Sequence, residues 1–162
     1  IIIVKTMELF NKIKQLLDTN NITYQTYNHP PTKTSEEAAS YRETPLRIGA
    51  KAILLKEKRG FIIAVIPANR KLDSKKLKKV LQSKKLRFST EDELKELTGC
   101  DKGSLPPFNI FFNLPIIVDI TLFEEEEMAF NAGSLENSIK MKTKDYDGLI
   151  SPRKEDISIE AS

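Results

Sequence analysis

Two apolar segments separated by a charged turn constrain the fold of this chain most strongly. Residues 49–56 have the sequence GAKAILLK, residues 61–66 have the sequence FIIAVI, and the turn between them contains Gly60. Residues 52–55 are apolar at successive positions, so both faces of this strand are predicted to be buried. Two such segments around a turn with Gly predict an antiparallel hairpin in the interior of a sheet.

Lys51 lies at the start of the first of these strands, on the same face as Ile53 and Leu55. A partly desolvated amine must find an anion, shift its pKa or take part in chemistry. Three roles therefore stay open from the local sequence. Lys51 is a strand-end lysine that keeps its ammonium in water, an anchor for phosphate or carboxylate, or a nucleophile that forms a Schiff base.

The remaining pattern predicts helices and strands that alternate along a single α+β domain. Apolar spacing predicts a first helix that Asn20 and Asn21 end. Capping residues predict further helices after Thr34, after Asp73 or Ser74, after Thr90 and after Thr143. Further strands are expected at residues 23–27, 115–120, 128–132 and 138–141. Short turns between strands favour a compact, largely antiparallel, barrel-like mixed sheet with surrounding helices.

Three segments are expected along the chain. Residues 1–6 form a loose N-terminal extension or an added edge strand, residues 7–150 form the domain, and residues 151–162 form a solvated tail. The apolar start is far too short to cross a membrane, so no membrane partner is expected. A single cysteine, Cys100, and a single histidine supply neither an internal disulfide nor a zinc ligand set. We therefore expect a cytoplasmic protein without metal or cofactor.

Two irregular stretches have a sequence suited to ligand contact. Residues 103–108, GSLPPF, combine a glycine, a hydroxyl, two prolines and an aromatic ring. Glycine permits close approach of a ligand to the backbone, and the prolines stiffen the loop. Residues 131–134, NAGS, interrupt a strand with another glycine. An ordinary turn and a hairpin corner are the alternatives.

Basic residues are concentrated in one segment. Residues 70–87 contain nine Lys or Arg and one acid, Asp73, in a chain whose net charge is only +3. The apolar residues Leu77, Val80 and Leu81 are expected to face inward, so the lysines face solvent. This concentration of positive charge favours a polyanionic partner such as a nucleic acid. Because no aromatic residues are interleaved with the basic ones, we expect contacts to the nucleic-acid backbone rather than stacking on its bases.

Taken in order, several motifs resemble the YbaK/ProX family, the aminoacyl-tRNA editing domain that is also inserted in bacterial prolyl-tRNA synthetases. The motifs are His29-Pro30 with residues 34–39 (TSEEAA), residues 49–56 (GAKAILLK), 67–73 (PANRKLD), 103–108 (GSLPPF) and 130–134 (FNAGS). Together they cover residues 8–150, which is nearly the whole chain.

The resemblance implies hydrolysis of the ester of a mischarged tRNA by a trans-acting deacylase, with tRNA-Pro carrying Ala or Cys as the expected substrate. It implies tRNA as a partner and a synthetase as a second one. Lys51 takes the position of the family's critical lysine. The implied substrate-binding residues are His29, Thr34, Gly103, Ser104, Pro106, Pro107, Phe108, Asn131, Ala132 and Gly133. The basic segment adds contacts to the tRNA backbone from Arg70, Lys71, Lys75, Lys76 and Lys79.

Two positions depart from the family pattern. Asn109 replaces a common glycine after Phe108, and Leu135 replaces a common histidine after the Gly-Ser turn. Because of these two departures, a second class of function stays open, in which the chain binds aminoacyl-tRNA or a synthetase without hydrolysing the ester. A Schiff-base enzyme acting on small carbonyl substrates through Lys51 is the third class.

Overall fold

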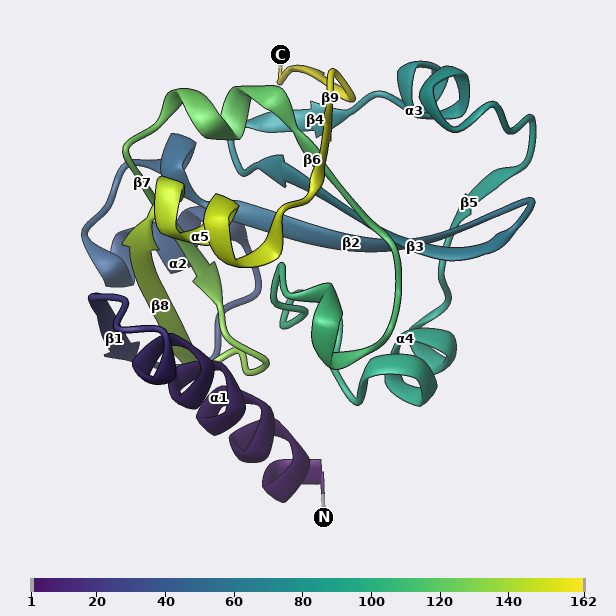
Figure 1. Cartoon of the computed structure of the whole chain (residues 1–162). Coiled ribbons are helices and arrows are strands. Elements are labelled where there is room, and N and C mark those ends of the chain that lie inside the picture. Colours follow the sequence, from purple (N-terminus) through teal and green to yellow (C-terminus); the bar gives the residue numbers. More distant parts are fainter. Residues whose placement is uncertain (1, 162) are drawn as a thin grey trace.

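The computed structural model describes residues 2–161, and within the first helix it describes side chains from Glu8 onward (Figure 1). The helices are α1 (Ile2–Thr19), α2 (Ser35–Arg42), α3 (Ser74–Leu81), α4 (Glu91–Thr98) and α5 (Thr143–Ile150), with short 3₁₀ turns η1 (Leu46–Ile48), η2 (Asn109–Phe111) and η3 (Ile120–Glu124). The strands are β1 (Tyr24–Asn28), β2 (Ala50–Glu57), β3 (Gly60–Pro67), β4 (Arg70–Leu72), β5 (Leu86–Phe88), β6 (Ile116–Asp119), β7 (Glu127–Asn131), β8 (Asn137–Lys142), β9 (Arg153–Glu155) and β10 (Ser158–Glu160).

These strands form a five-stranded sheet in the order β5-β2-β3-β6-β9, a three-stranded sheet in the order β1-β8-β7, and the pair β10-β4. The pairs β3-β6 and β6-β9 are parallel, and the other pairs of these sheets are antiparallel. A parallel bridge between Gly49 and Ala129 joins the two larger sheets. The predicted α+β domain with a largely antiparallel mixed sheet is confirmed, although the sheets do not close into a barrel.

The predicted hairpin is β2 paired with β3, and it separates two apolar clusters. The first cluster contains Leu54, Ile63 and Val65, together with Phe108 and Phe130 from later elements. The second cluster contains the alternate residues of the same strands and the apolar face of α3: Leu55, Ile62, Ala64, Ile66, Leu77, Leu81, Ile117 and Ile157. Because successive strand residues point to opposite faces, the run of apolar residues buries both faces of the hairpin.

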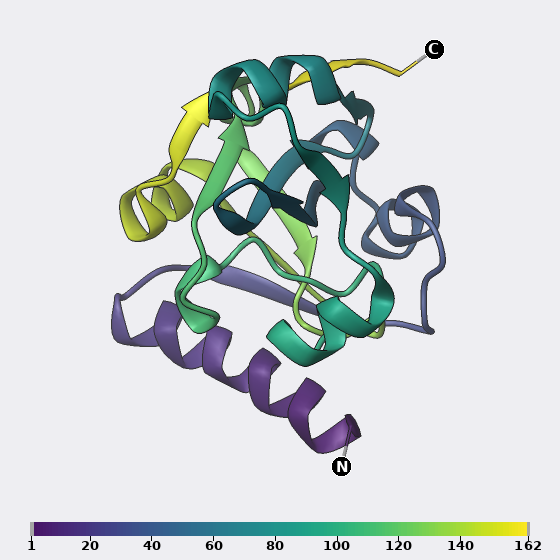
Figure 2. The ribbon, with the colours of Figure 1, turned by 90° about the vertical axis from the view of Figure 1, so that its right-hand side faces the viewer.

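Helices cover opposite ends of the molecule. Leu9, Phe10, Ile13 and Leu17 recur at helical spacing and fix α1 against the first cluster. Figures 1 and 2 both show α1 at one end and α3 at the other. None of the helices within residues 2–161 has the length and apolar character that crossing a bilayer requires.

The two chain ends differ from expectation at several points. The backbone of residues 2–6 continues α1, and so is neither a loose extension nor an edge strand, whereas residue 1 lies outside the described part. At the other end, α5 begins after Lys142, which makes no side-chain cap hydrogen bond, and Thr143 is already helical. The prediction that Thr143 caps this helix is therefore wrong.

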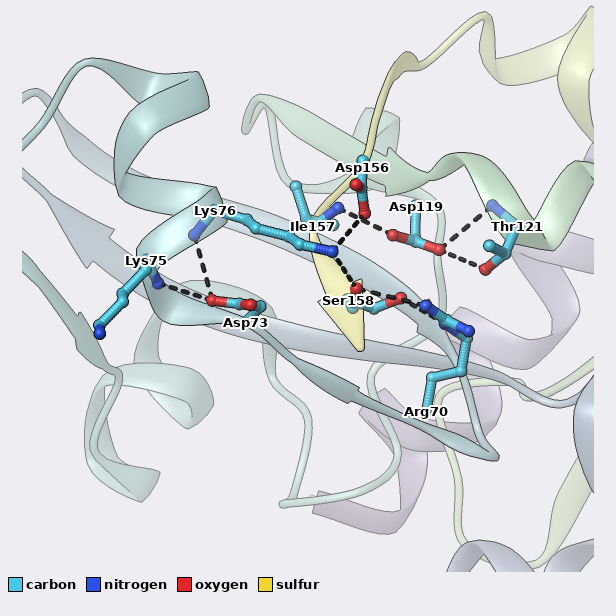
Figure 3. A network of polar contacts seen from close by, with 9 residues as sticks. All are labelled: Arg70, Asp73, Lys75, Lys76, Asp119, Thr121, Asp156, Ile157 and Ser158. Atoms are coloured by element: carbon cyan, nitrogen blue, oxygen red, sulfur yellow. Dashed lines mark hydrogen bonds and ion pairs between the residues drawn. The ribbon is translucent and has the colours of Figure 1, made fainter. Parts of the chain in front are cut away.

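Residues 151–161 are not a solvated tail, because β9 joins the large sheet and β10 pairs with β4. Figure 3 shows how the segment is fastened. The amide of Ile157 donates to Oδ1 of the buried Asp119 at 2.9 Å, and the Ile157 side chain fills the second cluster. Lys76 Nζ donates to Asp156 and to the carbonyl of Ser158, at 3.0 and 2.9 Å. Neither the isolated charges nor three-residue strands carry a periodic signal that sequence reasoning could detect.

The substitution Ile157→Ala is expected to lower the free energy of unfolding by about 2–4 kcal/mol, because it leaves a cavity in the second cluster. Denaturant titration measures the change. Ile159→Ala is the matched control, since Ile159 lies two residues further on in β10, is 42% exposed and should change stability by less than about 0.5 kcal/mol. Equal effects of the two substitutions would contradict the anchoring role of Ile157.

Candidate functional site

Arg42 is a buried cation at the last position of α2. This helix begins at Thr34, whose hydroxyl accepts from the Glu37 amide at 3.1 Å, and it turns Ala38, Ala39 and Arg42 inward at helical spacing. Only 6% of the Arg42 surface is exposed, and its Nε is buried without a hydrogen-bond partner among the described residues. Burial lowers the pKa of Arg42 to about 10, because desolvation disfavours the charged form.

A chain of hydrogen bonds connects Arg42 to the predicted loop. Nη2 of Arg42 donates to Oδ1 of Asn131 at 2.9 Å, and Nδ2 of Asn131 donates to the carbonyl of Gly103 at 2.8 Å. The amide of Gly133 in turn donates to the carbonyl of Ser104 at 2.9 Å. The structure therefore brings the loop at residues 103–108 and the turn at residues 131–134 together, as the resemblance implies.

His29 lies on the other side of Asn131. Its Nε2 is 2.8 Å from Oγ of Ser138, which also lies 3.2 Å from Oδ1 of Asn131. Its Nδ1 is 3.0 Å from the carbonyl of Pro30, which can only accept a hydrogen bond. Both ring nitrogens of His29 therefore have partners within the described residues. Tyr41 of α2 stacks on the imidazole with an interplanar angle of 7° and a centroid distance of 5.6 Å.

Lys51 is exposed in β2 and pairs with Ile66 of β3. Its position relative to the buried arginine follows from strand geometry. A Cβ added to Gly49 would lie 2.9 Å from the Ala68 Cβ and 4.0 Å from Arg42 Nη1, so this face of Gly49 looks toward the guanidinium. Residues two apart in a strand share a face and are about 7 Å apart. Gly49 and Lys51 therefore lie on one face at the start of β2, and the guanidinium of Arg42 approaches this face at Gly49.

Several loop residues that were expected to contact a ligand are instead buried inside the protein. Ser104 is buried rather than exposed, and its hydroxyl donates to the carbonyl of Asp101 at 2.8 Å. Phe108 is fully buried against Phe130 and Tyr146, with centroid distances of 5.3 and 5.6 Å. The remaining loop and turn residues of the predicted set, Pro106, Pro107 and Ala132, are buried as well. Sequence could show that the loop is stiff but not which of its groups face inward.

The hydroxyl of Tyr146 donates to the carbonyl of Pro107 at 2.7 Å and fixes the loop from α5. Burial raises the pKa of this phenol, which keeps the donor protonated. The amides of Ser104 and Gly133 are also used internally, by Asp101 and Ser104 carbonyls. These backbone groups therefore hold the loop in place.

Comparison with known proteins gives the family. The sequence model of the aminoacyl-tRNA editing domain matches residues 29–149. This chain belongs to that editing family. The multifunctional Ser/Thr-tRNA deacylase ProXp-y of Escherichia coli K12 is 32% identical over 142 residues, which are 85% of each chain. A proline-tRNA ligase of Fervidobacterium nodosum is 31% identical over 81 residues, which are 50% of this chain and 14% of the ligase.

A crystal structure of a candidate trans-editing enzyme for prolyl-tRNA synthetase superposes with a TM-score of 0.81 at 22% identity and covers 94% of this chain and 97% of that one. This likeness confirms the fold. The predicted resemblance and the predicted class of enzyme, an aminoacyl-tRNA hydrolase that edits, are confirmed by the family match.

Both departures from the family pattern lie beside the loop of the editing domain. Leu135 is half-buried, and its Cδ2 would be 3.4 Å from a Cβ at Gly103. Asn109 donates from Nδ2 to the carbonyl of Leu114 at 2.8 Å, so it braces the loop internally. The histidine position of the family is thus an apolar contact here.

Arg42, Tyr41 and Ser138 belong to the site although no motif indicated them. The spacing of Arg42 is the signal that could have identified it. Arg42 follows Ala39 by three residues and Ala38 by four, so it lies on the helix face that packs inward. Within residues 2–161, no cluster of three His, Cys, Asp or Glu side chains is arranged to hold a metal. A surface hollow of about 410 Å³ is lined by residues 123–126, 142–144 and 147, away from Lys51 and Arg42.

The substitution Gly133→Ala is expected to destabilise the editing domain by roughly 1–3 kcal/mol. Gly133 has a φ of +83°, and a Cβ there would lie 2.7 Å from Leu9 Cδ2. Thermal unfolding measures the effect. Gly148→Ala is the control, because that position in α5 has open space and should gain stability. A Gly133→Ala variant as stable as the parent would show that the turn does not require glycine.

Proposed function

We propose that this chain is a trans-acting deacylase that hydrolyses the ester between a small, wrongly attached amino acid and tRNA. The observation that carries the proposal is the pair of hydrogen bonds through which the Asn131 side chain connects the buried Arg42 to the loop at residues 103–108. An ester needs little activation, so positioning and charge stabilisation account for much of the rate.

In the proposed reaction, water adds to the ester carbonyl carbon and the bond from that carbon to the ribose oxygen breaks. The ribose oxygen takes up a proton from the attacking water and leaves as the free hydroxyl of the tRNA, and the amino acid is released as its carboxylate with the second proton of that water. The Lys51 ammonium holds the negatively charged 3′-terminal nucleotide, so that the ester is presented to the loop. The neighbouring ribose hydroxyl of the substrate assists, as the family resemblance suggests. His29, Thr34, Gly103 and Asn131 hold the walls of the site in place.

The amino acid and the tRNA are part of the proposal. The Escherichia coli relative is a Ser/Thr-tRNA deacylase, while the resemblance to prolyl-tRNA synthetase insertions favours tRNA-Pro carrying Ala or Cys. All four side chains are small, which agrees with a site whose histidine position is filled by Leu135. A synthetase partner and a cytoplasmic setting stay predictions.

Lys51→Ala should reduce deacylation by about 100-fold or more without loss of stability, because it removes charge stabilisation from an exposed position. Single-turnover release of amino acid from Ser-, Thr-, Ala- and Cys-charged tRNA measures it, with Pro-tRNA-Pro as the cognate control. Lys56→Ala is the matched variant, since Lys56 is exposed on the same strand and should retain activity.

Unchanged turnover in Lys51→Ala would remove this lysine from the mechanism. Tight binding of charged tRNA by the parent chain without release of amino acid would instead favour the binding module. That alternative is retained because Asn109 and Leu135 depart from the family pattern.

The basic segment is proposed to meet phosphates of the acceptor stem. Two of its predicted contacts are already used internally, because Arg70 donates from Nε to Ser158 Oγ at 2.6 Å and Lys76 pairs with Asp156. Lys71, Lys75 and Lys79 are exposed and carry the surface charge of this part of β4 and α3. These three lysines are therefore the stronger candidates for phosphate contact.

The double substitution Lys75→Glu/Lys79→Glu should weaken tRNA binding and reduce the slope of log K against log salt by about 1–2, since each phosphate contact contributes a little under one unit. Affinity measured over a salt series tests this. Reversal of Lys12 on α1 and Lys144 on α5 changes the net charge equally and should leave the slope unchanged. Equal slopes for both variants would exclude α3 as the tRNA-binding face.

A further inference from the structure

Tyr41 is the exposed member of a polar network between α2 and the three-stranded sheet. Ser138 of β8 and Asn131 of β7 are paired residues, so their side chains share one face of that sheet. The guanidinium of Arg42 holds α2 over this face by donating to Asn131. One residue earlier in α2, Tyr41 stacks on the imidazole of His29. Of these five residues, Tyr41 alone is exposed.

One face of the Tyr41 ring is covered and the other is open. The ring lies nearly parallel to the imidazole of His29, with an interplanar angle of 7° and a centroid distance of 5.6 Å, an offset arrangement that aromatic pairs favour. His29 beneath it is 7% exposed and Tyr41 is 47% exposed, so the exposed part of Tyr41 is mainly the opposite face and the edge of its ring. Because both nitrogens of His29 have partners, the stacked ring is held in a fixed orientation.

The stacked pair lies close to the loop at residues 103–108. Side-chain hydrogen bonds lead from His29, through two intervening side chains, to the carbonyl of Gly103. The backbone after His29 reaches the same place, because the amide of Thr32 donates to the carbonyl of Leu135 at 3.2 Å. Leu135 in turn lies against Gly103. The open aromatic face is therefore next to the part of the site that is proposed to receive the ester.

Resting on the proposed function, we propose that the open face of Tyr41 binds the terminal adenine base of the charged tRNA by stacking. The ribose of this nucleotide carries the ester, so its base is the aromatic group of the substrate nearest to the reacting carbonyl. Stacking uses the π-face of a base and needs no charge on the protein. Because His29 already fixes the ring, little conformational freedom is lost on binding.

The test compares two probes that cannot be hydrolysed, each labelled at its 5′ end and titrated with the full chain by fluorescence anisotropy. One is the trinucleotide CCA with serine attached through a 3′-amide, and the other is the same molecule without its terminal adenine base. The parent should bind the complete probe more tightly by about tenfold or more, which is the order expected for one base stacked on an aromatic ring.

Tyr41→Ala should lower the affinity for the complete probe to that for the probe without the base, and should leave the latter affinity unchanged. Tyr41→Phe retains the ring and should retain the preference. Tyr41→Leu covers His29 with an apolar side chain but offers no π-face, so it should lose the preference while its Tm stays that of the parent. Phe88→Ala is the matched control, because Phe88 is an aromatic residue of β5 that is 59% exposed, and it should leave the preference unchanged.

A purely structural role, in which Tyr41 only covers His29, predicts a different result. Tyr41→Ala would then weaken both probes equally, and Tyr41→Leu would keep the preference for the base. Either result would overturn the proposal, as would a full preference in Tyr41→Ala or a parent chain that binds both probes equally.

These titrations do not depend on hydrolysis. A parent that prefers the complete probe through Tyr41 but releases no amino acid from charged tRNA would retain the stacking site and reject the deacylase. A parent that deacylates charged tRNA but binds both probes equally would retain the deacylase and reject the stacking site.

Discussion

The antiparallel pairing of β2 with β3 is the interaction on which the rest of the molecule depends. Alternate residues of these strands enter two apolar clusters, so the hairpin can neither shift register nor leave one face exposed without emptying a core. The same pairing extends to Ala68, whose amide donates to the Gly49 carbonyl at 2.8 Å. Register therefore fixes which side of β2 carries Lys51.

Two hydrogen bonds explain how segments far apart in the sequence form one site. Arg42 at the end of α2, Asn131 at the end of β7 and the carbonyl of Gly103 meet through two hydrogen bonds. Leaving an arginine buried on a neutral acceptor sacrifices stability relative to an apolar contact, and such sacrifices are characteristic of sites that receive a charged ligand. In the editing domain, Tyr146 packs against Phe108 and hydrogen-bonds to Pro107, which fixes the loop, and Asn131 connects the loop to the buried Arg42.

The hairpin, α1 and the caps at Asp73 and Thr90 could be predicted because each depends on local periodicity or on side chains a few residues apart. The contacts between Ile157 and Asp119, and between Arg42 and Asn131, join residues far apart in sequence, so no local pattern contains them. The order of the motifs predicted that the loop at residues 103–108 and the turn at Gly133 belong to the same site. It could not reveal that Ser104 and Phe108 face the interior, because side-chain direction in an irregular loop has no period.

The central claim is that the ester-bearing end of tRNA lies between Lys51 and the loop at residues 103–108. A crystal structure with an adenosine 5′-monophosphate that carries serine through a non-hydrolysable 3′-amide tests it most directly. We expect the phosphate against Lys51, with the seryl group beside Gly103 and Leu135. The ligand in the hollow between Phe123 and Asp147, or a phosphate that does not touch Lys51, would contradict the account.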